Sequence, residues 1–227
     1  MNTVQLDDLA DATGAPHWWM RTLRGLGRPA THAPPGFDAA AQAGIQRMVT
    51  RLEAILDDNW TLIGGFANGG GRLDHILVGP RGVLALACSA LNGRIHCDGQ
   101  RWRRDKFDLY NSLVARDVPV ADPAAELFRA AMRLQQVLLG HTSIRHVAMA
   151  LVFTHPAATL GHVLHARLDL VTLLSDLKSA TLLQAMSGQP DHRTIDGVVE
   201  VIRHEHARFL RDAGKKRGKR PALFLER

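Results

Sequence analysis

Residues Gly71–Trp102, GRLDHILVGPRGVLALACSALNGRIHCDGQRW, form the stretch of sequence that decides the fold. Arg72–Val78 is predicted to be a strand, and Val83–Ala90 is a nearly continuous apolar run, which is typical of a central strand covered on both faces. Turns rich in Gly, Pro, Asn and Asp separate these segments from two further predicted strands, Arg94–Cys97 and Arg101–Arg103. The stretch therefore predicts a meander of consecutive strands with one central member.

The spacing of apolar residues predicts further helices and strands on both sides of this stretch. Upstream, apolar residues at three-to-four spacing predict a helix that begins near Asp38 and is about 18 residues long, followed by a strand at Asn59–Ala67. The elements predicted downstream are a helix from Asp122-Pro123 to Gly140, strands at Val147–Phe153 and Leu168–Val171, and helices at Leu173–Met186 and Thr194–Leu210. This order predicts a mixed α/β or α+β fold around one sheet flanked by helices.

The chain divides into four predicted parts. Residues 1–37 read as an N-terminal appendage and linker that ends in Pro and Gly breakers, and 38–190 as the domain. Residues 191–213 read as a C-terminal helix and 214–227 as a basic tail. The adjacent tryptophans Trp18 and Trp19 either dock on the protein's own core or contact a partner or membrane surface.

Charge and composition narrow the class of protein. The chain has 227 residues, 46% of them hydrophobic, and a net charge of +6, and Arg208–Arg227 alone accounts for that charge with eight cations and two acids. The body is therefore neutral overall, and the basic character belongs to the tail. No stretch predicts a membrane span or a secretory signal, and two cysteines indicate a reduced, cytoplasmic setting.

Several short motifs of the deciding stretch stand in one order at matching spacing. They are Asp74-His75, Gly79-Pro80-Arg81-Gly82-Val83, Gly93-Arg94-Ile95 and Asp98-Gly99-Gln100-Arg101-Trp102. In these motifs the chain resembles the nuclease-related domain, a branch of the PD-(D/E)XK nuclease superfamily, over residues 38 to about 185. The resemblance implies a PD-(D/E)XK-like core sheet flanked by helices.

The resemblance also implies that most of the family's catalytic groups are missing from this chain. Hydrolysis of a phosphodiester with Mg²⁺ needs several carboxylates at the metal and a lysine near the attacking water. The family's Glu-x-Lys pair falls on Ala87 and Ser89, and its helix Glu falls on Ile45, so only Asp74 remains. We therefore expect a degenerate active site, no hydrolysis and no cofactor.

An alternative is a nuclease centre rebuilt from other residues. Asp98, Asp105, Lys106 and Glu126 follow the lost positions and could supply new groups, with Asp74 as a ligand for Mg²⁺ or Mn²⁺. Structural roles are the other explanation for these groups: Asp98 lies in an Asp-Gly turn, which favours Asp, and Asp105 could form an exposed ion pair with Arg103 or Arg104.

Two basic segments are candidate nucleic-acid contacts. The first follows the meander and the second is the tail, and their members are Arg101, Arg103, Arg104, Lys106, Lys215, Lys216, Arg217, Lys219 and Arg220. Cations that neutralise phosphates release counterions, whereas a frayed, solubilising terminus has the same composition. Alternation along the strand predicts that Trp102 is a core residue and not a base-stacking platform.

Two histidine pairs and the two cysteines are further candidates for functional residues. His162 and His165 could share a helix face, whereas His204 and His206 are two apart and do not, and neither pair has a full zinc ligand set. Cys88 and Cys97 are predicted to be free buried thiols. Three functions stay open: a fold that binds nucleic acid or a protein without hydrolysis, a metal-dependent nuclease, and a pure protein–protein module.

Overall fold

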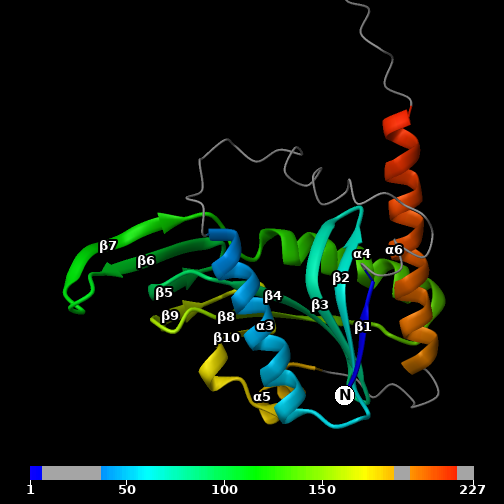
Figure 1. Cartoon of the computed structure of the whole chain (residues 1–227), viewed down its shortest axis with the longest axis horizontal. Helices are drawn as coiled ribbons and strands as arrows, with labels where there is room; N and C mark the ends of the chain where they lie inside the picture. Colours follow the sequence, from blue (N-terminus) through cyan, green and yellow to red (C-terminus); the bar gives the residue numbers. More distant parts are fainter. Residues whose placement is uncertain (7–36, 187–194, 219–227) are drawn as a thin grey trace, which may run out of the picture.

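The computed structural model describes residues 1–6, 37–186 and 195–218, and within them it contains two mixed sheets with helices packed against them (Figure 1). We call the larger one sheet A. Its strands, in spatial order, are β1 (Asn2–Gln5), β2 (Thr61–Asn68), β3 (Gly71–Gly79), β4 (Gly82–Ser89), β8 (Val147–Phe153) and β10 (Leu170–Leu173). The strands β2, β3 and β4 are antiparallel neighbours, whereas β4, β8 and β10 run parallel.

Sheet B is smaller and lies against one face of sheet A. Its strands, in spatial order, are β7 (Leu113–Val120), β6 (Arg101–Phe107), β5 (Gly93–Asp98) and β9 (Ala158–Leu164). Ile95, Cys97 and Trp102 point inward from this sheet and belong to the same buried cluster as residues of β4 and β8. In Figure 1 the β6–β7 hairpin extends away from the rest of the molecule.

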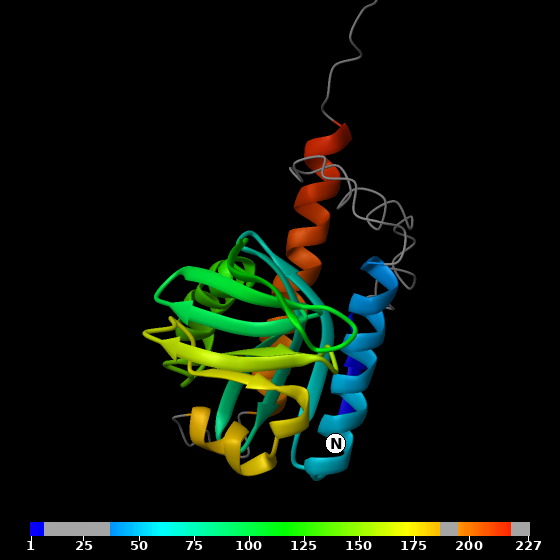
Figure 2. The ribbon, with the colours of Figure 1, turned by 90° about the vertical axis from the view of Figure 1, so that its left-hand side faces the viewer.

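Helices cover both faces of sheet A, so the core has two layers. On one face, α3 (Phe37–Ile55) and α5 (Ser179–Ala185) pack on Leu84 and Leu86 of β4. On the other face, α4 (Ala125–His141) and α6 (Ile195–Gly218) pack with sheet B on Val83 and Ala85. Figure 2 shows α3 and α4 on opposite sides and α6 rising beyond the sheets. This double cover explains the continuous apolar run of β4.

Most predicted elements occur close to their predicted limits. Val83, Leu84, Leu86 and Val147 are at most 1% exposed, as expected for central strands. The expected parallel strand at Leu168–Val171 is β10, and the predicted mixed fold with helices on its faces is present. None of the described helices is long and apolar enough to cross a membrane.

The structure differs from the predictions in four places. There are two sheets and not one, because β5, β6 and β9 pair with one another and the unpredicted β7 joins them. The predicted helix at Leu173–Met186 is a short 3₁₀ turn, Leu174–Asp176, followed by the seven-residue α5. Asn2–Gln5 of the predicted appendage forms β1 beside β2. The last helix reaches Gly218 and so includes part of the predicted tail.

Candidate functional site

The candidate site lies where the β3–β4 ladder ends. The final residue pair of this ladder is His75 with Leu86, so Asp74 and Ala87 lie one residue beyond the end of the ladder. There the Asp74 carboxylate takes the place of a backbone acceptor, because its Oδ2 accepts the Cys88 N–H at 2.7 Å. The side chain that the resemblance identifies as the remnant of the active site therefore stabilises the strand end.

The surroundings of Asp74 disfavour its charged form. Burial is the largest influence and raises the pKa of the Asp74 carboxyl, and the nearby Glu126 carboxylate raises it further. The hydrogen bond from Cys88 and the charge of Arg72 act in the opposite direction. A carboxyl with a raised pKa and a backbone donor already bound is a weak ligand for a divalent cation.

The other three positions that the resemblance implies for the site lie on β4 and α3. Ala87 is half-buried against the core, and Ser89 is buried, with its carbonyl accepting the Thr154 N–H at 2.9 Å. Ile45 is half-buried on α3, beside Gly44, which packs so closely on Thr154 that a Cβ would not fit. Asp74, Ala87 and Ser89 therefore lie near one end of the β3–β4 pair, and Gly44, next to Ile45, packs on the Thr154 that bonds to Ser89. Apart from Asp74, the side chains at these positions are apolar or uncharged.

Of the residues considered for a rebuilt site, only Glu126 interacts with Asp74. Its Oε1 accepts the Arg72 N–H at 2.9 Å, beside the start of α4. Asp98 and Asp105 lie on sheet B, where each contacts a histidine. Across the described ranges no three His, Cys, Asp or Glu side chains form a metal-binding group. These residues do not fit a resident Mg²⁺ or Mn²⁺ ion.

Asp105 and its basic neighbours are arranged differently from the expected ion pairs. Asp105 does not pair with Arg103 or Arg104; its Oδ1 accepts the Asp117 N–H at 3.0 Å, and its Oδ2 lies 3.4 Å from His96. That backbone bond is the main reason why the pKa of Asp105 lies below its ordinary value. This hydrogen bond depends on the tertiary structure, because Asp117 belongs to β7, a strand that the sequence did not predict.

The basic cluster of sheet B is only partly free. Arg103 pairs with Asp117 at 3.4 Å, and Arg104 donates to the Asn92 side chain at 2.6 Å. The side chains of Arg101 and Lys106 are exposed and form no hydrogen bond or ion pair with other described residues. Trp102 is 3% exposed and lies in the core, as predicted.

Five tail cations were also candidates. Lys215, Lys216 and Arg217 belong to the last turns of α6, whereas Lys219 and Arg220 lie outside the described residues, as do Trp18 and Trp19. The helix that carries the first three extends past the sheets in Figure 1.

The histidine pairs do not form metal sites. His162 and His165 are not on a helix: His162 is in β9, where its N–H donates to Nδ1 of His96, and His165 follows the strand with a φ of 52°. His206 is on α6, but its Nδ1 accepts the Ala67 N–H at 3.1 Å. Their roles in the described structure are those of structural hydrogen-bonding groups.

Both thiols are free, as predicted. Cys88 points toward α3, where its Sγ lies 3.3 Å from Met48 Sδ, and burial raises its pKa well above the ordinary range. Burial also raises the pKa of Cys97 to about 11. Protonated, buried thiols of this kind are poor nucleophiles.

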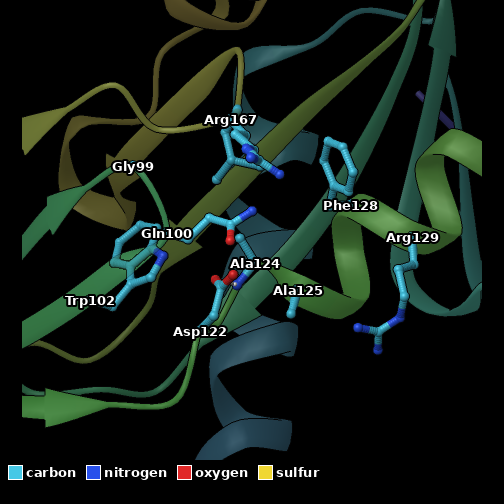
Figure 3. Close-up of a pocket in the computed structure, with 10 residues that line it drawn as sticks. Gly99, Gln100, Trp102, Asp122, Ala124, Ala125, Phe128, Arg129 and Arg167 are labelled. Carbon is cyan, nitrogen blue, oxygen red and sulfur yellow. Dashed lines mark hydrogen bonds between the residues drawn. The ribbon is translucent and has the colours of Figure 1, made fainter.

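A surface cavity of about 200 Å³ lies between the β5–β6 turn and the start of α4. Figure 3 shows Gln100 facing the Arg167 side chain, with Trp102 and Asp122 beside it. Asp122 Oδ1 accepts the Ala124 N–H at 2.8 Å and so helps to start the helix. This cavity contains none of the candidate catalytic positions.

A second cavity, of about 340 Å³, lies at the carboxyl ends of β8 and β10. Arg47 and Arg51, one turn apart on α3, line it and donate to the carbonyl oxygens of Thr154 and Leu177 at 3.1 and 3.0 Å. The sequence did not identify these two arginines as candidate functional residues. Their i,i+4 spacing was the available signal, but it is equally typical of a solvated helix face.

Comparison with known proteins gives one match. No curated protein and no solved structure matches the chain. The family model for the nuclease-related domain matches residues 40–154, which is just over half of the 227 residues. The matched segment runs from α3 to the end of β8 and contains Asp74, Ala87 and Ser89. The chain therefore belongs to the nuclease-related domain family.

Proposed function

We propose that this protein is a nuclease-related domain that binds nucleic acid without hydrolysing it. The observation that carries the proposal is the set of residues at the family's catalytic positions: Asp74 is the one carboxylate among them, its Oδ2 accepts the Cys88 N–H at 2.7 Å, and the other three positions hold Ala87, Ser89 and Ile45. Phosphodiester hydrolysis with a divalent metal needs several oxygen ligands and a positive group near the water. The family's catalytic positions supply one carboxylate, Asp74, and no lysine in this chain.

Binding is supported by the distribution of free cations. Arg101 and Lys106 are exposed and unpaired among the described residues, and the end of α6 adds further positive residues. The two cysteines are free, which agrees with a cytoplasmic setting where nucleic acids are present.

A cleavage assay tests the first half of the proposal. We expect the purified full chain to leave plasmid and single-stranded DNA intact with Mg²⁺ or Mn²⁺. Cleavage that is abolished by both Asp74→Ala and Glu126→Gln would instead establish the alternative, a rearranged metal-dependent nuclease. Glu53→Gln, on an exposed part of α3, serves as the matched control.

Salt-dependent binding tests the second half. Each duplex phosphate that is neutralised contributes about 0.9 to the slope of log K against log salt. Removing the chain from Gly214 onward should lower the magnitude of that slope by at most about 4–5, and Arg101→Ala with Lys106→Ala by about 2. Nucleic-acid affinity that is absent from the full chain at low salt would favour the third alternative, a pure protein–protein module.

A further inference from the structure

The end of the β6–β7 hairpin exposes an unusual amount of apolar surface. Leu109 and Tyr110 are 101% and 90% exposed, and Leu113 and Val114 follow at 41% and 65%. These are four of the seven large exposed hydrophobic side chains found among the described residues. A concentrated apolar patch on a projecting element is typical of an interaction site, and Figure 1 shows this hairpin extending from the body.

The turn that carries Tyr110 is firmly built. The Asp108 carboxylate accepts the N–H groups of Tyr110 and Ser112 at 2.9 and 2.8 Å. The Asp108 N–H donates to the Ser112 carbonyl at 3.0 Å, and the Asn111 N–H donates to the Asp108 carbonyl at 3.1 Å. Asn111 takes the left-handed conformation, with a φ of 60°. The Tyr110 backbone is therefore held in place before any partner arrives, which lowers the entropic cost of binding.

The charges of the hairpin favour a negatively charged partner. Its three acids are engaged internally: Asp108 holds the turn, Asp105 accepts the Asp117 N–H, and Asp117 pairs with Arg103. In contrast, the side chains of Arg101, Lys106 and Arg116 are exposed and form no hydrogen bond or ion pair with described residues.

Two of the free cations flank the apolar end. Lys106 pairs with Ala115 in the ladder, so that Lys106 and Arg116 occupy neighbouring positions on the two strands. An aromatic ring in the turn, with cations on the two strands that adjoin the turn, is a combination that binds single-stranded nucleic acid, where bases stack on aromatic side chains and phosphates contact Lys and Arg.

We propose that the end of this hairpin is a stacking platform for an unpaired base. Tyr110 stacks on the base, Leu109 packs beside it, and Lys106 and Arg116 contact the adjacent phosphates. The bases of a duplex already stack on each other, so the platform selects single-stranded over double-stranded nucleic acid. This inference rests on the proposed nucleic-acid binding and specifies its substrate class.

Affinity measurements on the full chain test the platform. The probes are an oligothymidylate of about 15 nucleotides, within the site size of single-strand binders, and a duplex of the same length. Tyr110→Ala should raise the Kd for the single strand about tenfold, whereas Tyr110→Phe, which keeps the ring, should change it less than about twofold. Leu164→Ala, at an exposed position of β9, is the control for loss of apolar surface.

A second readout uses the fact that the chain contains one tyrosine. Incorporated 3-fluorotyrosine gives a single ¹⁹F resonance, which reports on Tyr110 alone. We expect it to shift saturably with oligothymidylate and to stay in place with the duplex. Because the side chain is exposed, folding of the variants is not at risk from the substitution.

The outcomes separate the two proposals. Oligonucleotide binding that Tyr110→Ala leaves unchanged, with no ¹⁹F shift, overturns the platform but keeps the proposed function. No binding by the wild type to either probe overturns both. A sedimentation mass of a dimer that Tyr110→Ala converts to a monomer would assign the apolar end to a second copy of the chain and overturn the platform.

Discussion

Strands β8 and β7 show how differently the two sheets of this protein use their residues. All seven residues of β8 are buried, whereas none of the eight residues of β7 is. Sheet A is covered by helices or by sheet B on both faces, while the outer face and the hairpin end of sheet B contact solvent. The difference indicates that stability resides in sheet A, and that sheet B can vary its exposed side chains for binding.

The largest effect should come from the centre of sheet A. Leu84→Ala removes a side chain with no exposed surface, so we expect it to lower the free energy of unfolding by about 2–5 kcal/mol. Leu113→Ala, at the partly exposed start of β7, should change it by less than about 1 kcal/mol. Urea denaturation measures both, and equal losses would contradict the division between the sheets.

The next effect is a loss of stability in acid that originates in sheet A. His75 is 3% exposed, and burial, with a smaller contribution from Arg72, lowers its pKa to about 4. Between these two pKa values the unfolded chain therefore binds a proton at His75 that the folded chain does not bind. The free energy of unfolding should fall by about 3 kcal/mol as the pH drops from the ordinary histidine pKa to about 4.

His75→Gln should reduce this slope in urea denaturation series at several pH values. The slope should not vanish, because burial also lowers the pKa of His206. A profile identical to that of the wild type would show that His75 is not the group responsible.

Sheet B has its own rigid point despite its exposed face. Gly93 has a φ of 88°, and a Cβ there would meet the carbonyl oxygen of Asp105 on the neighbouring strand. We expect Gly93→Ala to lower the free energy of unfolding by about 1–3 kcal/mol. Gly69→Ala, where a Cβ meets nothing, is the matched control, and thermal denaturation of the pair should separate them.

The smallest effect concerns the remnant Asp74. Burial raises its pKa, so the folded chain holds a proton that the unfolded chain releases, and the contribution of Asp74 to stability declines as the pH rises from acid to neutral. Asp74→Asn keeps an oxygen that accepts the Cys88 N–H and removes this decline. At pH 7 the variant should be as stable as the wild type or more stable, by less than about 1 kcal/mol. A marked loss of stability at pH 7 would mean that the charge itself is required.

Local patterns predicted those elements whose burial is uniform. The continuous apolar run of β4 and the seven apolar residues of β8 are typical of strands covered on both faces, and both strands were found. The second sheet was missed because β7 has no alternation and gains its order from pairing with β6. The same pairing determines that Asp117, and not Arg103, is the partner of Asp105 through its backbone N–H.

The sequence by itself determined which chemical groups stand at the positions that the resemblance implies for the site: Asp74 has a carboxyl group, Ala87 and Ile45 are apolar, and Ser89 has an uncharged hydroxyl group. It also determined the central strand, because hydrophobic burial depends on composition over a short stretch. Only the tertiary structure decided that the Asp74 carboxylate binds the Cys88 N–H, and that Lys106 and Arg116 occupy neighbouring positions on two paired strands that adjoin the turn of the exposed Tyr110. Those contacts join residues on different strands, and local periodicity does not determine where a ladder ends or where a bulge shifts its register.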